Sequence, residues 1–181
     1  LVHNGIIENY AVLKQELEQR GHLFLSETDT EVLVHLIEDI QEKSKLSLFE
    51  AVRVALSEVV GAYAIVVIDK RNPNQLIAAR KSSPLVIGIG EDEYFLASDA
   101  TPIVEYTKNV IYLDDDEIAL INLNEGLTLK TISNEIKTPY IQELEMQLEA
   151  LEKGGYEHFM LKEIYEQPQS ILDSMRGRIN I

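Results

Sequence analysis

An asparagine followed by a glycine near the start of the chain is the pair of residues best suited to chemistry. Asn4 and Gly5 follow the apolar residues Leu1 and Val2, with His3 between. An asparagine side-chain amide and the N–H of an adjacent glycine are two neutral donors that can converge on one oxygen as it gains negative charge. The pattern therefore predicts an oxyanion-binding turn where a strand ends and a helix begins. The same dipeptide also suits a turn made for backbone reasons alone.

A second pattern runs through the whole chain as short segments in a fixed order. Its members are residues 2–9 (VHNGIIEN), 26–31 (SETDTE), 61–64 (GAYA), 79–88 (ARKSSPLVIG), 96–99 (LASD) and 157–168 (EHFMLKEIYEQP). These segments resemble the glutamine-hydrolysing domain of the glucosamine-6-phosphate synthase family, the glutamine:fructose-6-phosphate aminotransferases. The run from Lys162 to Pro168 is the specific part, because it is similar to the entry into the sugar-isomerising half of those proteins. The chain departs from the pattern at Ser82, where many relatives have glycine.

The resemblance implies roles for three residues. The Asn4 side-chain amide and the Gly5 N–H would form the oxyanion hole, and the Asp29 carboxylate would bind the α-ammonium group of glutamine. Asp29 also suits a structural role, since an acidic residue in the first turn of a helix stabilises the helix dipole. His3 is expected to be structural, because the general base in the resembling enzymes is the amino group of an N-terminal cysteine.

The nucleophile implied by the resemblance is missing from this sequence. In the resembling enzymes the thiolate of the N-terminal cysteine attacks the glutamine amide, releases ammonia and leaves a glutamyl thioester that water hydrolyses. The chain has no cysteine and begins with Leu1 rather than methionine. We therefore expect an N-terminally truncated fragment, inactive by itself, of the domain that supplies ammonia for converting fructose 6-phosphate to glucosamine 6-phosphate in hexosamine biosynthesis. The implied partners are glutamine, the sugar isomerase domains of the same polypeptide and further copies of the chain.

Two other functions stay open on the sequence. One is another N-terminal-nucleophile amidotransferase, such as an amidophosphoribosyltransferase, which would differ in the acceptor of the ammonia. The other is a catalytically inactive interaction module that keeps the fold of the family.

Composition excludes several classes of partner. Sixteen basic and thirty-one acidic residues give a net charge of -15, which repels nucleic-acid phosphates and anionic lipids. No apolar stretch approaches the roughly 20 residues of a membrane helix, and no secretory signal pattern opens the chain, so we expect a cytoplasmic protein. We also expect no cofactor and no metal. Thiolate ligands are absent, residues 114–116 (DDD) suit a hairpin tip, and His22, His35 and His158 are scattered along the sequence.

Hydrophobic spacing predicts three helices followed by a series of strands. The first helix has Ile6, Tyr10, Leu13 and Leu17 on one stripe and ends at Gly21. The second and third begin with capping patterns at residues 28–31 (TDTE) and 47–50 (SLFE). Strands are predicted at residues 62–68, 76–80, 85–89, 94–97, 110–113, 117–121 and 127–132, with a short helix over 98–106 and hairpin turns at 114–116 and 124–126. After residue 139 the pattern predicts helices at about 141–154 and 157–165, and another that starts near residue 169.

These elements indicate an α+β fold with antiparallel sheets. The family resemblance implies a four-layer αββα sandwich of the N-terminal-nucleophile hydrolase type, incomplete at its N-terminus in this chain. We assign residues 1–138 to the C-terminal part of the glutaminase domain and residues 139–181 to a helical tail and linker toward the sugar isomerase domains. Strands missing upstream would leave a sheet edge and apolar surface exposed, and we therefore expect self-association.

Overall fold

The computed structural model describes residues 1–144 and 155–175, without the side chains of residue 169 and residues 172–175. It divides into two compact units, residues 1–144 and residues 145–181. The helices of the first unit are α1 (Tyr10–Gln19), α2 (Asp29–Ser44) and α3 (Leu48–Glu58). Its strands are β1 (Val2–Ile7), β2 (Gly61–Asp69), β3 (Asn72–Lys81), β4 (Val86–Ile89), β5 (Tyr94–Ala97), β6 (Asn109–Tyr112), β7 (Glu117–Asn122), β8 (Gly126–Thr131), β9 (Ile136–Lys137) and β10 (Gln142–Glu143). The second unit contains α5 (Phe159–Met175).

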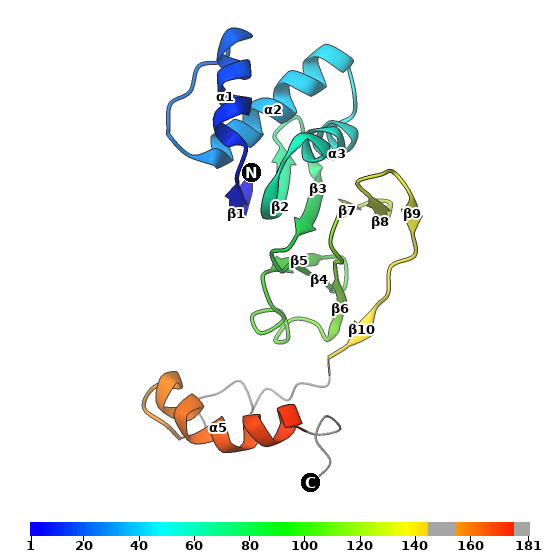
Figure 1. Cartoon of the computed structure of the whole chain (residues 1–181). Coiled ribbons are helices and arrows are strands. Elements are labelled where there is room, and N and C mark those ends of the chain that lie inside the picture. Colours follow the sequence, from blue (N-terminus) through cyan, green and yellow to red (C-terminus); the bar gives the residue numbers. More distant parts are fainter. Residues whose placement is uncertain (145–154, 176–181) are drawn as a thin grey trace. The chain divides into compact units, whose positions relative to one another are not determined.

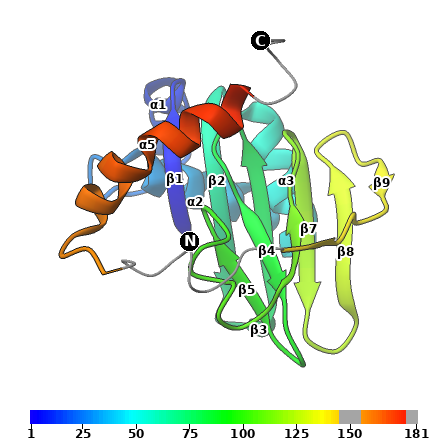
Figure 2. The same ribbon diagram turned by 90° about the horizontal axis from the view of Figure 1, so that it is seen from below.

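Three layers make up the first unit. A six-stranded sheet has the order β1-β2-β3-β7-β8-β9, and a four-stranded sheet has the order β10-β6-β4-β5. All of their strand pairs are antiparallel. Helices α1 to α3 cover one face of the larger sheet and the smaller sheet covers the other (Figure 1). Figure 2 shows the larger sheet face-on, with β1 at one edge. The predicted α+β class with two stacked antiparallel sheets is confirmed.

Two apolar cores lie on the two faces of the six-stranded sheet. On β2, Tyr63 and Ile65 belong to the core beneath the helices, whereas Ala64 belongs to the core between the two sheets. This division follows from the alternation of side chains along a strand. Because β2 is covered on both faces, its sequence is a continuous apolar run rather than an alternating one.

Side-chain caps begin the second and third helices, as the sequence predicts. Thr28 accepts the N–H of Glu31 at the start of α2, and Ser47 accepts the N–H of Glu50 at the start of α3. The Glu31 carboxylate reaches further back than in a capping box and accepts the N–H groups of Leu25 and Ser26 at 2.8 and 2.6 Å. The bond from the Leu25 N–H, followed by that from the Ser26 hydroxyl, lowers the pKa of Glu31 to about 2. Glu31 therefore anchors the loop that precedes α2.

Several predicted elements of the first unit are wrong. Ile6 lies in β1 rather than on the first helix, and its side chain is 67% exposed. Residues 98–100 form bends and residues 101–106 form turns rather than a helix, and the Ile103 and Val104 N–H groups share the Ala100 carbonyl as acceptor. Residues 114–116 join β6 to β7, which lie in different sheets, so they are not a hairpin tip. The hairpin turn at 124–126 is confirmed between β7 and β8.

The structure also differs from the prediction after residue 139. Gln142 and Glu143 form β10, which pairs with β6, and Leu144 is buried. A helix is therefore wrong for these residues, while the rest of that prediction, residues 145–154, lies outside the described residues. Helix α5 continues through Pro168, where a stop was predicted. Within residues 1–144 and 155–175, no helix combines the length and apolar character required to cross a bilayer.

Candidate functional site

Strand β1 carries the predicted oxyanion residues at the edge of the six-stranded sheet. It pairs with β2, with Asn4 opposite Ala64 and Gly5 opposite Tyr63. The prediction of a turn at these residues is wrong, because the strand runs on to Ile7. Asn4 and Gly5 are both exposed. Opposite residues of an antiparallel pair point to the same side of the sheet. Asn4 therefore lies on the same face as Ala64, which is the face covered by the four-stranded sheet.

The register of β1 and β2 directs the Gly5 N–H toward the open edge of the sheet. The Ile7 N–H donates to Asp29 Oδ2 at 2.9 Å, whereas the Glu8 N–H donates to the Val60 carbonyl, next to β2, at 2.8 Å. In an antiparallel ladder, hydrogen-bonded and non-bonded pairs alternate along the strand. Gly5 lies two residues before Ile7, so its N–H points to the same side. The Gly5 N–H and the Asp29 carboxylate therefore face the same open edge.

Close strand pairing explains why residue 5 is a glycine. Gly5 has a φ of 141°, and a Cβ atom there would lie 2.1 Å from the Ala62 carbonyl oxygen. Gly61 makes the reciprocal approach, with a φ of 131° and a Cβ position 2.2 Å from the Ile6 carbonyl oxygen. Both distances are shorter than any real carbon–oxygen contact, so only glycine fits at either position.

Asp29 joins the start of α2 to β1. One carboxylate oxygen, Oδ2, accepts the Ile7 N–H, and Oδ1 lies 3.5 Å from the Thr30 hydroxyl and 3.8 Å from His3 Nδ1. The Asp29 side chain remains 23% exposed. A carboxylate has about four acceptor positions, so this one can accept a further donor. Asp29 therefore fastens the start of α2 to β1 and keeps acceptor capacity at the edge of the sheet.

His3 lies between β1 and α2. Its side chain is 2% exposed, and its Nδ1 lies 3.0 Å from the Thr30 hydroxyl. Its Nε2 is buried and has no hydrogen-bond partner among the described residues. This placement makes His3 part of the packing that positions β1 against α2.

Asn9 fixes the end of β1, a role that sequence reasoning missed. Its side-chain amide donates to the Glu58 carbonyl at 2.8 Å, and its Oδ1 accepts the Val60 N–H at 3.0 Å. The end of β1 is thereby fastened to the connection between α3 and β2. One indication of this role was present in the sequence, since Asn9 is the last residue of the segment 2–9 that resembles the family, but no function was assigned to it.

Comparison with known proteins identifies the family. Residues 1–105 match the family model described as a glutamine amidotransferase domain. The chain belongs to this glutamine amidotransferase family. The chain is 61% identical over 181 residues to the glutamine–fructose-6-phosphate aminotransferase (isomerizing) of Bacteroides thetaiotaomicron. It is 54% identical over 182 residues to the protein of the same name from Chlorobaculum tepidum. The whole chain is covered in both cases, and it spans about 30% of the length of each relative.

A solved structure supports the same fold. Glutamine phosphoribosylpyrophosphate amidotransferase from B. subtilis, complexed with ADP and GMP, matches the amidotransferase domain with a TM-score of 0.62 and 32% identity. The match covers 75% of this chain and 29% of that one. The N-terminal-nucleophile amidotransferase fold predicted from the resemblance is thereby supported by structure as well as by sequence.

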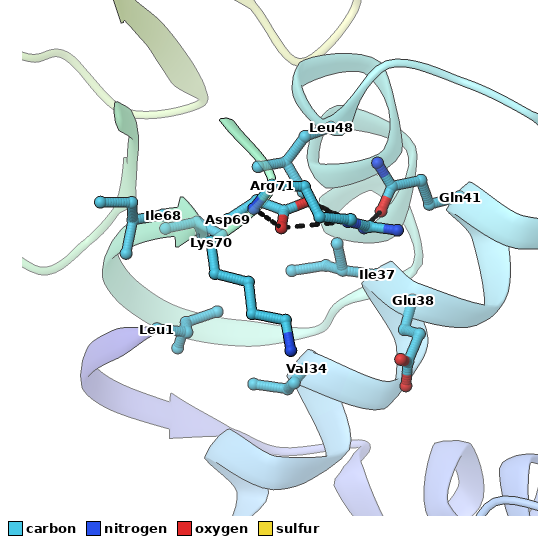
Figure 3. Close-up of a pocket in the computed structure, with 11 residues that line it drawn as sticks. Leu1, Val34, Ile37, Glu38, Gln41, Leu48, Ile68, Asp69, Lys70 and Arg71 are labelled. Atoms are coloured by element: carbon cyan, nitrogen blue, oxygen red, sulfur yellow. Dashed lines mark hydrogen bonds and ion pairs between the residues drawn. The ribbon is translucent and has the colours of Figure 1, made fainter. Parts of the chain in front are cut away.

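The amidotransferase domain has a cavity of about 350 Å³ away from the predicted site. Its lining includes Leu1, Val34 of α2 and the turn between β2 and β3 (Figure 3). In this turn the Arg71 side chain is held by Asp69 and Gln41. Two further cavities lie beside β3 and β7 and beside the end of α3. Asn4, Gly5 and Asp29 line none of these three, and lie instead along the edge of β1.

The acidic run at residues 114–116 fastens the loop that contains Ser82. Asp115 Oδ1 accepts the Ser82 N–H at 2.8 Å and lies 2.6 Å from the Arg80 guanidinium. The Ser82 N–H, and then the charge of Arg80, lower the pKa of Asp115. Ser82 has a φ of 61°, a left-handed conformation that glycine adopts more readily. The backbone at Ser82 is therefore the one that a glycine would prefer.

Two of the histidines expected to be scattered lie side by side in the amidotransferase domain. His22 Nδ1 in the loop after α1 is 3.1 Å from His35 Nδ1 on α2. The expectation is therefore wrong for this pair. Sequence spacing gave no indication of their contact, which arises when the loop folds back on α2.

Proposed function

We propose that this domain binds L-glutamine at the open edge of β1 and takes part in releasing ammonia from its side chain. In this proposal the Asn4 amide and the Gly5 N–H donate to the carboxamide oxygen as it becomes an oxyanion, and Asp29 accepts the α-ammonium group. The ammonia would serve to convert fructose 6-phosphate to glucosamine 6-phosphate. The family match and the names of the two relatives support this function.

The spacing along β1 is the observation that carries the proposal. Asp29 is bonded to the N–H of Ile7, which lies two residues, roughly 7 Å, along the strand from Gly5. In glutamine, four bonds of about 1.5 Å separate the α-nitrogen from the carboxamide carbon, a span of roughly 5 Å when extended. An extended glutamine along the edge can therefore direct its two ends toward Asp29 and Gly5 at once.

The proposed chemistry divides the work between this chain and a nucleophile outside it. Attack by a thiolate on the carboxamide carbon moves an electron pair onto the oxygen, where two preorganised donors stabilise the charge. Collapse of this intermediate expels ammonia and leaves a thioester that water cleaves to glutamate. Since none of the 181 residues is a cysteine, we expect the purified chain to release neither ammonia nor glutamate from glutamine.

Nuclear magnetic resonance tests the binding step without turnover. Glutamine is titrated into the ¹⁵N-labelled chain, and we expect saturable shifts of the Gly5 amide and of the Asn4 side-chain NH₂. Glutaramate, which keeps the carboxamide but lacks the α-amino group, should bind more weakly. In Asp29→Asn, which can still accept the Ile7 N–H, the affinities for the two ligands should become alike.

The control is Asp99→Asn, because Asp99 is an acidic residue that bonds a backbone N–H far from β1. This variant should bind glutamine like the parent chain. The proposal is refuted if glutamine leaves the Asn4 and Gly5 signals in place, or if Asp29→Asn still prefers glutamine to glutaramate. Failure of binding altogether would instead favour an inactive interaction module.

The second enzyme class, an amidophosphoribosyltransferase, is less well supported. The aminotransferase relatives match the whole chain at 61% and 54% identity, whereas the phosphoribosylpyrophosphate amidotransferase structure matches 75% of it at 32%. The sugar-phosphate acceptor is favoured because the aminotransferase matches extend over the last segment, residues 157–168.

We also propose that residues 139–181 lead toward sugar isomerase domains and that the chain self-associates. Support for self-association comes from the edge strand β1, where Val2 and Ile6 are 71% and 67% exposed on the same face. Sedimentation of the chain at several concentrations tests this point, and a monomer at every concentration would contradict it. A cytoplasmic location stays a prediction.

A further inference from the structure

Two histidines and a glutamate meet at the contact between α2 and the loop that follows α1. His22 lies in the loop, and His35 and Glu38 lie three residues apart on α2. The His35 Nδ1 atom is 3.1 Å from His22 Nδ1 and 3.6 Å from Glu38 Oε2. All three ligand atoms lie within 4.8 Å of one another. None of these residues has a part in the glutamine chemistry proposed above.

The separations suit ligands of one metal ion. Zinc binds imidazole nitrogen at about 2.0–2.1 Å with tetrahedral angles, so two such ligands lie roughly 3.3 Å apart. The observed distances of 3.1 and 3.6 Å lie on either side of this value. The rings themselves meet edge to face, with centroids 5.0 Å apart, so stacking does not account for the approach of the two nitrogens.

A carboxylate lies near the Nε2 atom of each histidine. His22 Nε2 lies 3.2 Å from Asp39 Oδ1, and His35 Nε2 lies 3.7 Å from Glu31 Oε1. The Asp39 carboxylate, at hydrogen-bond distance from His22 Nε2, favours the tautomer with the proton on that nitrogen, which leaves the His22 Nδ1 lone pair free. The two Nδ1 atoms lie at hydrogen-bond distance, 3.1 Å, so one donates to the other in the metal-free chain, and a shared cation would take the place of that proton. Carboxylate, histidine and metal in line are the usual surroundings of a metal-binding histidine.

The carboxylate behind His22 is held firmly in place. The Asp39 side chain is only 5% exposed and is bonded to Arg20 and to Lys43, each at 2.7 Å. The ligand atoms themselves are accessible, since the side chains of His22, His35 and Glu38 are 15%, 19% and 55% exposed. An ion can therefore enter from solvent and keep a water molecule as its fourth ligand.

We propose that His22, His35 and Glu38 bind one divalent transition-metal ion of the zinc type. Two imidazoles with one carboxylate favour Zn²⁺, Co²⁺ or Ni²⁺ over Mg²⁺ and Ca²⁺, which prefer oxygen ligands alone. The ion would tie the loop after α1 to the second turn of α2 and so stabilise the packing of these two helices. Its role is structural, because the site is distinct from the glutamine-binding edge of β1.

Titration calorimetry of the 181-residue chain with Zn²⁺ tests the site. Excess Mg²⁺ is included to suppress weak binding to surface carboxylates, since the net charge is -15. We expect one Zn²⁺ per chain, and Co²⁺ should give the intense visible absorption of a tetrahedral site. At free Zn²⁺ about 100 times Kd, the unfolding equilibrium constant should fall about 100-fold.

Substitutions assign the ligands. His22→Gln and His35→Gln should each weaken Zn²⁺ binding by more than the roughly 10- to 100-fold that follows loss of a group hydrogen-bonded to a ligand. His22→Gln lies in a loop and serves if His35→Gln does not fold. The control is His158→Gln, since His158 belongs to the second unit and its side chain is 73% exposed. The proposal is overturned if the parent chain binds no Zn²⁺, or if His22→Gln binds as tightly as His158→Gln.

Discussion

Replacing Gly5 by alanine tests the pairing of β1 with β2, on which the proposed site depends. The added Cβ atom would lie 2.1 Å from the Ala62 carbonyl oxygen, whereas ordinary contacts begin at 3.4 Å. The two backbones must therefore separate locally by up to 3.4 minus 2.1, or 1.3 Å. Such a shift breaks the pairing of Ile6 with Ala62, which the register makes a hydrogen-bonded pair.

The magnitude follows from two contributions. A φ of 141° strains alanine by about 1–3 kcal/mol, and loss of a backbone hydrogen bond adds about 1 kcal/mol. We expect Gly5→Ala to lower the free energy of unfolding by about 2–4 kcal/mol. Gly21→Ala is the matched control, because Gly21 has a φ of 97° but no atom within 4 Å of its Cβ position. In Gly21→Ala only the backbone strain applies. The lower conformational entropy of the unfolded variant offsets part of this strain, so we expect a loss of about 1 kcal/mol.

Urea unfolding followed by far-ultraviolet circular dichroism measures both variants, since the chain has no tryptophan. The decisive quantity is the difference between them, about 1 kcal/mol or more, because the backbone strain is common to both variants and only Gly5→Ala breaks strand pairing. If Gly5→Ala and Gly21→Ala cost the same within about 0.5 kcal/mol, β1 does not pair with β2 as described. The direction of the Gly5 N–H would then lose its basis.

Three further predictions concern the surroundings of the site. Asn9→Ala should lower the free energy of unfolding by about 1–2 kcal/mol in urea melts, because it removes two hydrogen bonds, one of them to Val60. Ser82→Gly should raise it by about 0.5 kcal/mol, since glycine tolerates a φ of 61°, while Ser83→Gly should not raise it. The folded-state pKa of Glu31 is lowered from 4.5 to about 2, so its contribution to stability is full above pH 4.5 and is lost as the pH falls toward 2. Glu31→Gln should flatten the pH dependence of stability in this window, and an unchanged slope would contradict the assignment.

Local sequence patterns determined most of the secondary structure, because they depend on neighbouring residues alone. The caps at Thr28 and Ser47 mark the starts of α2 and α3, and the apolar run after Gly61 became the central strand β2. Errors arose where local signals compete. Ile6 has helical spacing relative to Tyr10, yet pairing with Ala62 places it in a strand. The pattern of residues 98–106 favours a short helix, yet this segment forms bends and turns.

The family, the fold class and the candidate residues Asn4, Gly5 and Asp29 were accessible from the sequence by resemblance. Only the tertiary structure placed Asp29 against β1, since its bond to Ile7 joins residues 22 positions apart. The same holds for the pairing that makes Gly5 an edge-strand glycine rather than a turn residue, and for the meeting of His22 with His35. These contacts depend on how the helices and strands pack against one another. The spacing of side chains along the sequence does not specify that packing.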